Sequence, residues 1–209
     1  PWFAFLGAVL VTFSVLLLGR KGGALPVNTL LLAGIAANYF FVSLSSLLAS
    51  LGKNVLHRAV LWSLEGFAGA NWDTFFAVFP LVLLGLLALL FLSKPLDLIL
   101  LGDESALGLG LNVGRSKLFF TLIVGLLTGA AVSVSGLIGF VGLVVPHIAR
   151  MIVGAKHSRL LPFAFLSGGV LLLGADNLAR SLIPGSEIPV AVITALMGVP
   201  FFLYLLRKE

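Results

Sequence analysis

Few side chains of this chain of 209 residues could do chemistry, and the clearest are two charged pairs. Asp103 and Glu104 are adjacent and are followed by a Gly-rich stretch. Two neighbouring acids favour the start of a short helix, because the helix dipole attracts negative charge there. Asp176 and Arg180 are four residues apart, so the Arg could pair along its own helix or bind a carboxylate of a partner. Neither pattern predicts a catalytic centre.

The sequence contains no clear pattern for a metal site, a disulfide or a nucleotide-binding loop. The chain has no cysteine, which excludes disulfides and thiolate metal sites. His147 has no His, Cys or carboxylate at ligand spacing, so we expect a structural group rather than a metal ligand. The sequence also contains no Gly-x-x-x-x-Gly-Lys-Ser/Thr phosphate loop. We therefore predict that the chain is not an enzyme and itself binds no metal or cofactor.

The composition indicates a membrane protein. Hydrophobic residues make up 60% of the chain and charged residues only 10%, which is too little polar surface for a water-soluble domain of this size. The net charge of +5 is carried in short basic clusters between apolar runs. Such clusters are typical of anchors at membrane surfaces, so nucleic acid is not predicted as a partner.

Seven apolar runs are long enough, or nearly so, to cross a bilayer as helices. They are residues 3–18, 29–51, 74–92, 118–135, 137–153, 160–178 and 188–206. The predicted fold class is therefore all-α, a polytopic bundle of about seven transmembrane helices with additional short helices. We treat residues 1–209 as one transmembrane domain.

Residues 118–149 carry no Asp, Glu, Lys or Arg, yet they are too long for one crossing. A single helix of this length would measure about 48 Å, against about 30 Å for a hydrocarbon core. Gly and Ser loosen the helix at Ser133–Gly136, so we expect two crossings joined by a tight turn there. In the run before it, Gly125 and Gly129 are spaced for close helix packing.

The Lys and Arg residues are distributed unevenly between the two sides that this division defines. One side holds ten: Arg20, Lys21, Lys94, Arg115, Lys117, Arg150, Lys156, Arg159, Arg207 and Lys208. The other holds three: Lys53, Arg58 and Arg180. Because basic residues favour the cytoplasmic side, this places the C-terminus in the cytoplasm. Treating 118–149 as one crossing gives six against seven, which favours the division.

Two longer segments between the runs are not plainly apolar. Residues 53–73 lie on the outer side and have helix-like spacing with an aromatic residue suited to a pore mouth. Residues 94–117 lie on the cytoplasmic side and contain Asp103–Gly110, which predicts a short helix parallel to the membrane. Such a helix suggests a docking surface for a soluble partner.

Several phrases resemble the FecCD-type permeases, the membrane subunits of type II ABC importers for iron-siderophores, haem and vitamin B12. The phrases are residues 32–36, 66–72, 94–98, 136–162, 173–180, 187–190 and 194–203, among them Gly-Phe-Val-Gly-Leu-Val-Val-Pro-His-Ile-Ala-Arg at 139–150. The resemblance implies a ten-helix permease, of which this chain would lack the first three helices. It also implies a bacterial or archaeal cytoplasmic membrane.

The partners that the resemblance implies are a second permease copy, two ATP-binding subunits on the cytoplasmic side and a periplasmic or lipid-anchored substrate-binding protein. ATP and Mg would be bound by the ATP-binding subunits, with no cofactor on this chain. The path formed by the two copies would carry an iron-siderophore, haem or cobalamin complex.

Functional residues carry over from the family position by position. The family's coupling motif, which enters a cleft on the ATPase, matches Asp103, Glu104, Ser105, Ala106 and Gly110, with Ser105 in place of one Ala. Arg180 matches an Arg that pairs with a carboxylate of the binding protein. Residues 53–73 match the gate helix. Candidates for the translocation path are Ser43, Ser45, Ser46, Ser50 and Asn54, although serines also bond back to their own helix.

Two other classes of membrane protein are alternatives. A secondary transporter built from repeats would use coupling ions at broken helices. Apart from the interfacial Asp176 no acid lies within the runs, which makes an ion-coupled carrier less attractive. An intramembrane enzyme would need a catalytic pair at depth, and Asp176 with the loop acids offers none.

Overall fold

The computed structural model describes residues 2–19, 26–50, 66–182 and 188–207, and every regular element in these ranges is a helix. The seven long helices are α1 (Trp2–Gly19), α2 (Val27–Ser50), α4 (Trp72–Phe91), α7 (Val113–Ser135), α8 (Val141–Val153), α9 (His157–Ser181) and α10 (Val190–Leu206). Two short helices, α5 (Ser93–Ile99) and α6 (Asp103–Gly108), connect α4 to α7. The all-α prediction is confirmed, and each predicted apolar run forms a helix.

Four of these helices, α2, α4, α7 and α9, are long and apolar enough to span a membrane. A lipid-embedded chain must satisfy its backbone groups within each segment, which is why such runs become helices. The other three long helices, α1, α8 and α10, are shorter but also apolar. With 13 residues, α8 measures about 20 Å, so the non-helical residues 136–140 before it would have to contribute to any crossing.

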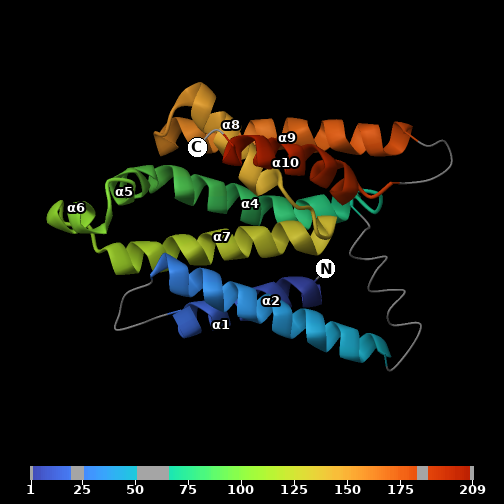
Figure 1. The fold of residues 1–209 in the computed structure, drawn as a ribbon, viewed down its shortest axis with the longest axis horizontal. Coiled ribbons are helices and arrows are strands. Elements are labelled where there is room, and N and C mark those ends of the chain that lie inside the picture. Colours follow the sequence, from blue (N-terminus) through green and yellow to red (C-terminus); the bar gives the residue numbers. More distant parts are fainter. Residues whose placement is uncertain (1, 20–25, 51–65, 183–187, 208–209) are drawn as a thin grey trace.

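Successive long helices run back and forth between two ends of the molecule (Figure 1). The left end in this view carries α5 and α6 and is called the α6 end below; the right end is called the opposite end. The N-terminal end of α9 lies at the α6 end and its C-terminal end at the opposite end. The last helix, α10, ends at Leu206 in the half of the molecule nearer α6.

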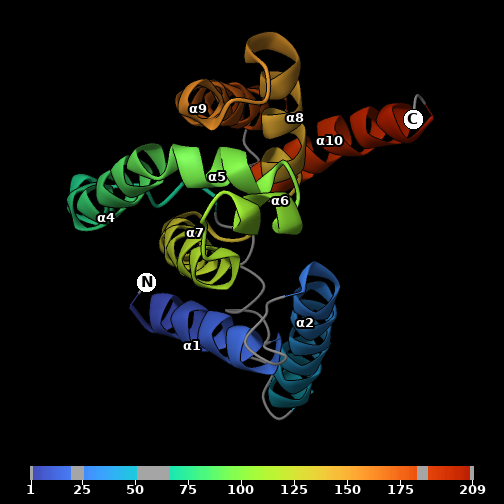
Figure 2. The ribbon, with the colours of Figure 1, turned by 90° about the vertical axis from the view of Figure 1, so that its left-hand side faces the viewer.

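Seen along the bundle, α8 and α9 lie on one side, α4 and α7 in the middle, and α1 and α2 on the other side (Figure 2). The α7–α1 contact is close because α7 presents glycines there. A Cβ at Gly125 would lie 2.4 Å from the side chain of Thr12, and one at Gly129 would lie 2.8 Å from Ala8. The packing role predicted for this glycine pair is confirmed.

The break between α7 and α8 begins where the sequence predicts but is longer. The helix α7 ends at Ser135, and Gly136 has a φ of 67°. Helix α8 begins only at Val141, because Phe140 also has a left-handed φ of 66°. The expectation of a helix from residue 137 was therefore wrong. Phe140 packs against α10 at Gly198. A Cβ added to Gly198 would lie 2.4 Å from the Cβ of Phe140.

Candidate coupling site

The candidate coupling site is the segment Ser93–Leu111, which contains α5 and α6 and is called the coupling segment below. The chain leaves α4 at Leu92, turns into α5, and reaches α6 at the extreme end of the molecule (Figure 1). It then enters α7, where the Asn112 side chain accepts a hydrogen bond from the backbone N–H of Arg115 at 3.1 Å. This cap holds the start of α7 in place beside the segment.

Glycines set both ends of α6. Gly102 precedes the helix with a φ of 97°, and Gly110 follows it with a φ of 84°, values that other residues rarely adopt. The N–H of Gly110 donates to the carbonyl of Leu107 at 2.9 Å, and the N–H of Leu111 donates to that of Ala106 at 3.0 Å. These two bonds form a Schellman motif, which ends a helix at a glycine. The predicted acid-led, Gly-closed helix is thus present.

The two faces of α6 differ in exposure. Ala106 is fully buried, whereas Glu104, Ser105 and Leu107 are exposed. Leu109 is also exposed. The exposed side chains of α6 and the residue after it are therefore acidic, hydroxyl and leucine side chains.

The α6 side of the coupling segment is tied to α7 by an ion pair. Lys117 Nζ donates to Asp103 Oδ2 at 2.6 Å, and the Asp103 side chain remains largely exposed. Of the two predicted acids, Asp103 thus contacts its own chain, while Glu104 points to solvent as an exposed side chain. Glu104 is the better placed of the two to contact a partner.

The α5 side is tied to α9 through Asp97. Asp97 Oδ1 accepts a hydrogen bond from the backbone N–H of His157 at 2.8 Å and lies 2.6 Å from Nδ1 of the same residue. A carboxylate can only accept, so the ring carries its proton on Nδ1. Burial alone would raise the pKa of Asp97, but the His157 bonds, with the charges of His157 and Lys156, hold that pKa below its ordinary value.

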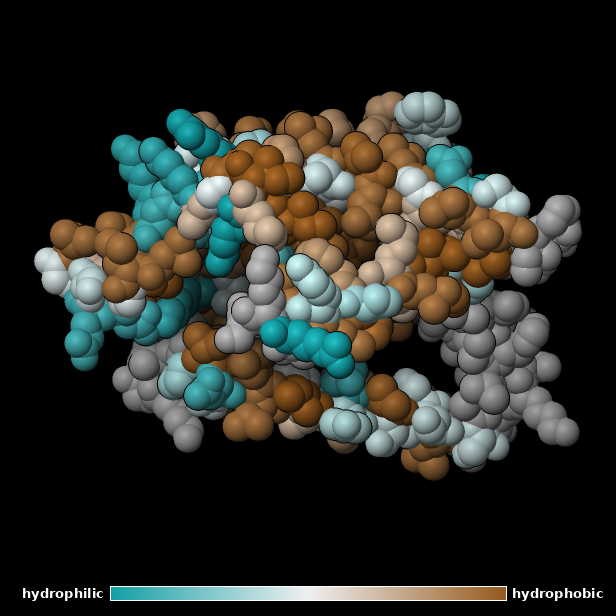
Figure 3. All heavy atoms as spheres, turned by 45° about the horizontal axis from the view of Figure 1, so that its top comes forward, coloured by the Kyte–Doolittle hydropathy of each residue, from teal (hydrophilic) through white to brown (hydrophobic). Residues whose placement is uncertain are grey.

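The α6 end is also the basic end of the molecule. Of the eight Lys and Arg residues in the described ranges, six lie on or beside the helix ends at this end, namely Lys94, Arg115, Lys117, Arg150, Lys156 and Arg159, and Arg207 follows α10, which ends in the half of the molecule nearer α6. Hydrophilic residues gather at this end and hydrophobic ones cover the middle of the molecule (Figure 3). The eighth basic residue, Arg180, lies at the opposite end.

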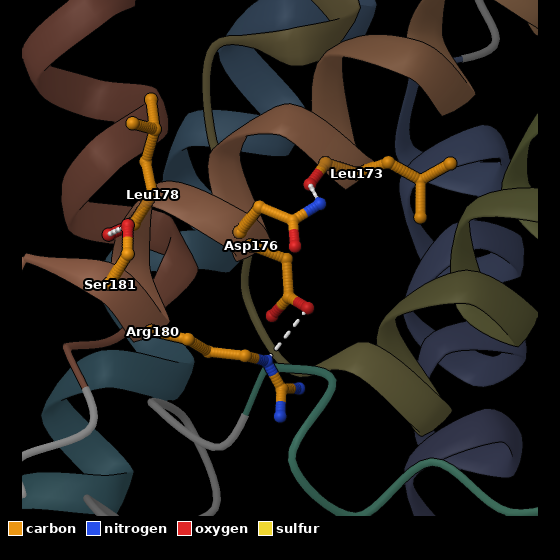
Figure 4. Close-up of polar contacts among 6 residues, drawn as sticks. Leu173, Asp176, Leu178, Arg180 and Ser181 are labelled. Carbon is orange, nitrogen blue, oxygen red and sulfur yellow. Dashed lines mark hydrogen bonds and ion pairs between the residues drawn. The ribbon is translucent and has the colours of Figure 1, made fainter.

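Arg180 lies on the last turn of α9 beside Asp176. Its Nε donates to Asp176 Oδ2 at 2.9 Å, so the pair along one helix, one of the two possibilities left open by the spacing, is present (Figure 4). The Arg180 side chain is 49% exposed.

The serines proposed for the path lie on α2 and are exposed. Ser46 and Ser50 bond back to their own helix, to the carbonyls of Val42 at 2.9 Å and Leu47 at 2.6 Å. A groove of about 540 Å³ between α1, α2 and α7 is lined on α2 by Gly34, Ala37, Asn38 and Phe41. Ser43, Ser45, Ser46 and Ser50 are not part of this lining.

Two further predictions fall largely on residues outside the described ranges. Asn54 and most of the outer segment 53–73 belong to residues 51–65, outside the described ranges. In the described part of that segment, residues 66–73, Asn71 caps α4 by accepting from the N–H of Thr74 at 2.8 Å. The gate assignment therefore stays a prediction.

The contact between Asp97 and His157 was not predicted from the sequence. Both lie in phrases that carry the family resemblance, at 94–98 and 136–162, but 60 residues separate them. The sequence shows only an Asp in a predicted short segment and a His near the start of a long apolar run. Neither pattern indicates which residue the other contacts.

The described residues form helices only, and four of these helices are long and apolar enough to span a membrane, which supports an integral membrane protein. The model of the FecCD transport family matches residues 1–208. The chain therefore belongs to the FecCD transport family.

Named relatives agree with this assignment. The cobalamin import system permease protein BtuC of Halobacterium salinarum is 40% identical over 206 residues, which cover 99% of this chain and 55% of the relative. The hemin transport system permease protein HmuU of Yersinia pestis is 42% identical, with 99% and 62% covered. The Fe(3+)-citrate import system permease protein YfmD of Bacillus subtilis is 40% identical, with 99% and 61% covered. The chain thus spans between half and two thirds of their length.

A solved structure has the same fold. It is an inward-facing conformation of a metal-chelate type ABC transporter, with a TM-score of 0.86 and 33% identity, covering 99% of this chain and 72% of the other. The predicted family and fold class are confirmed.

Proposed function

We propose that the chain belongs to the permease subunit of an ATP-driven importer of an iron-siderophore, haem or cobalamin complex. The observation that carries the proposal is the coupling segment: a Gly-bounded helix with exposed Glu104, Ser105 and Leu107, held at the basic end of the bundle. The family membership and the names of the relatives support it.

In the proposed assembly, two permease copies form the path, and two ATP-binding subunits bind ATP and Mg on the cytoplasmic side. The α6 end faces the cytoplasm of a bacterial or archaeal cell, together with the C-terminus, as its basic residues favour. A periplasmic or lipid-anchored substrate-binding protein docks at the opposite end, where Arg180 lies. Asp103, Glu104, Ser105, Ala106 and Gly110 form the contact with the ATPase.

The mechanism is a shift between conformations. Closure of the ATP-binding subunits displaces the coupling segments, and the displacement favours one arrangement of the bundle over another. Such a shift requires that the partner contact the two arrangements with different affinity. Exposed leucines and acids on a rigid, Gly-bounded helix provide a contact of that kind. The path itself is assigned to α2 and the gate segment 53–73.

The test is uptake by the full-length gene product, co-purified with the ATP-binding subunit encoded beside it and reconstituted in proteoliposomes. Labelled ferric hydroxamate, ferric citrate, haemin and cobalamin are offered with the cognate binding protein. We expect uptake of one of them that requires ATP and is lost when the phosphate-loop Lys of the ATPase is replaced. Uptake driven by an ion gradient without ATPase would contradict the proposal and favour a secondary transporter.

A further inference from the structure

The helix that follows the coupling segment in sequence is α7. The contact between Asp97 and His157 joins the segment to another long helix, α9. Asp97 belongs to α5 and His157 is the first residue of α9. Their side chains are 29% and 14% exposed, so the contact is partly shielded from water. Through it the segment is bonded to α9 as well as to α7.

The geometry makes this contact stiff. One oxygen, Asp97 Oδ1, receives both the backbone N–H of His157 at 2.8 Å and its ring Nδ1 at 2.6 Å. The first bond caps α9 with a side chain from another helix, since the first N–H groups of a helix have no partner within it. The second fixes the rotation of the ring. Charged acceptors make both bonds stronger than bonds between neutral groups.

Helix α9 can carry a displacement far from this contact. It has 25 residues, about 37 Å in length, and runs to the opposite end of the molecule (Figure 1). Near that end Ala175 and Ala179 pack with Val190 and Ile193 of α10 in a buried cluster. Asp176 and Arg180 lie on the same turns (Figure 4). A movement of its first residue thus reaches both α10 and the proposed docking residue.

We propose that Asp97 and His157 form a positioning joint through which displacement of the coupling segment moves α9 and, with it, the opposite end of the bundle. The inference rests on the proposed function, because it assumes that a partner displaces the segment. Neither residue is assigned contact with ATP or with the transported complex.

A purely structural cap would have a different signature. After its loss, ATP hydrolysis and the response of the opposite end would fall together in the assembled complex. Loss of a positioning joint separates two activities: the ATPase still closes, but the opposite end no longer responds. The test therefore measures ATP hydrolysis and the response of the opposite end of the bundle on the same preparation.

The experiment uses the full-length permease with its ATP-binding subunit in nanodiscs, with ATP and vanadate as the probe. Ser181 is replaced by Cys and labelled with an environment-sensitive fluorophore, since it lies exposed at the far end of α9 and residues 1–209 contain no other Cys; any Cys elsewhere in the full-length protein is replaced by Ser. The variants are Asp97→Ala, Asp97→Asn and His157→Ala. Arg159→Ala is the matched control, an exposed charge on the same first turns of α9.

We expect Asp97→Ala to reduce the fluorescence response to ATP–vanadate about fivefold while ATP hydrolysis and the assembled amount stay near those of the parent. Asp97→Asn restores most of the response, because its amide oxygen can accept both bonds. His157→Ala keeps the backbone cap and loses the ring, so its response falls about twofold. Arg159→Ala responds as the parent does.

A full response in Asp97→Ala, or in assembled His157→Ala if Asp97→Ala does not assemble, overturns the joint and leaves the proposed function intact. A parent complex that neither hydrolyses ATP nor responds to ATP–vanadate overturns the proposed function, and the joint with it.

Discussion

Each end of α9 carries a contact between an Asp carboxylate and a nitrogen-bearing side chain, and the two pairs are built differently. At the α6 end Asp97 and His157 come from two helices, and their contact includes a backbone cap. At the opposite end Asp176 and Arg180 belong to the same helix, four residues apart. The first pair joins elements that are distant in sequence, and the second orients side chains on one element.

This difference separates two functions that one helix can serve. A pair between helices transmits position, because neither helix can shift without breaking it or moving the other. A pair within a helix adds only tenths of a kcal/mol and leaves the helix's position to its packing. The α6 end is thus suited to receive a displacement, and the opposite end to present charge to a partner.

The largest expected effect comes from disrupting the end of α6 in the coupling segment, which is bonded to α9 through Asp97. In Gly110→Pro the N–H that bonds Leu107 is lost, and a φ of 84° becomes impossible for the fixed proline ring. We expect a local cost of about 3 kcal/mol or more and loss of ATP-dependent uptake, with hydrolysis continuing. Uptake and hydrolysis are measured on the same proteoliposomes.

The control for this change is Gly108→Ala, two residues earlier, at the last residue of α6. Gly108 is helical, and an added Cβ there meets nothing within 4 Å. Uptake should be kept. If Gly110→Pro also imports normally, the coupling assignment of the segment is wrong.

A direct comparison of the two ends is the second prediction. Asp97→Ala removes a cap and a bond to an ionised group and should destabilise the protein by about 1–3 kcal/mol. Asp176→Ala removes an exposed pair within one helix and should cost only about 0.5 kcal/mol or less. Thermal unfolding in detergent, followed by tryptophan fluorescence, gives both shifts. Equal shifts would remove the distinction between the ends.

A third prediction concerns docking at the opposite end. Arg180→Glu reverses a charge that we assign to the binding protein and should weaken its docking at low salt about tenfold. Asp176→Asn is the control, because it breaks the pair within α9 without reversing Arg180. Affinity is measured by surface plasmon resonance on the nanodisc complex. An affinity unchanged at low salt in Arg180→Glu would rule out the docking role.

The smallest effect is a pH dependence at the α6 end. The pKa of Asp97 in the folded protein lies below its ordinary value of 3.8. The charge therefore adds stability that is fully present above pH about 4 and is lost as the pH falls through the folded-state pKa. The melting temperature of the parent should exceed that of Asp97→Asn at pH 7, and the gap should narrow toward pH 3. A gap that widens on acidification would contradict the assignment.

Much of the fold follows from local pattern. The apolar runs, the end of α7 at Ser135 and the Gly110 closure of α6 were predictable because each depends on neighbouring residues. The later start of α8 was not, since it requires a left-handed Phe140 that is held by contact with Gly198 of α10.

The candidate site divides in the same way. The acidic helix and the Asp176–Arg180 spacing are visible in a few residues, whereas the Asp97–His157 contact depends on where two distant helices pack. The serines of α2 have a pattern that fits either a path or bonding to their own helix. Two of them bond to their own helix, which spacing alone could not predict.

The central claim is that the coupling segment and the C-terminus share the cytoplasmic side and that the far end of α9 lies outside. It is tested most directly by labelling single cysteines at Ser105, Ser181 and Arg207 of the full-length protein in intact cells with a membrane-impermeant maleimide. The account predicts that Ser181→Cys is labelled at once, and Ser105→Cys and Arg207→Cys only after permeabilisation. Labelling of Ser105→Cys and Ser181→Cys from the same side would contradict it.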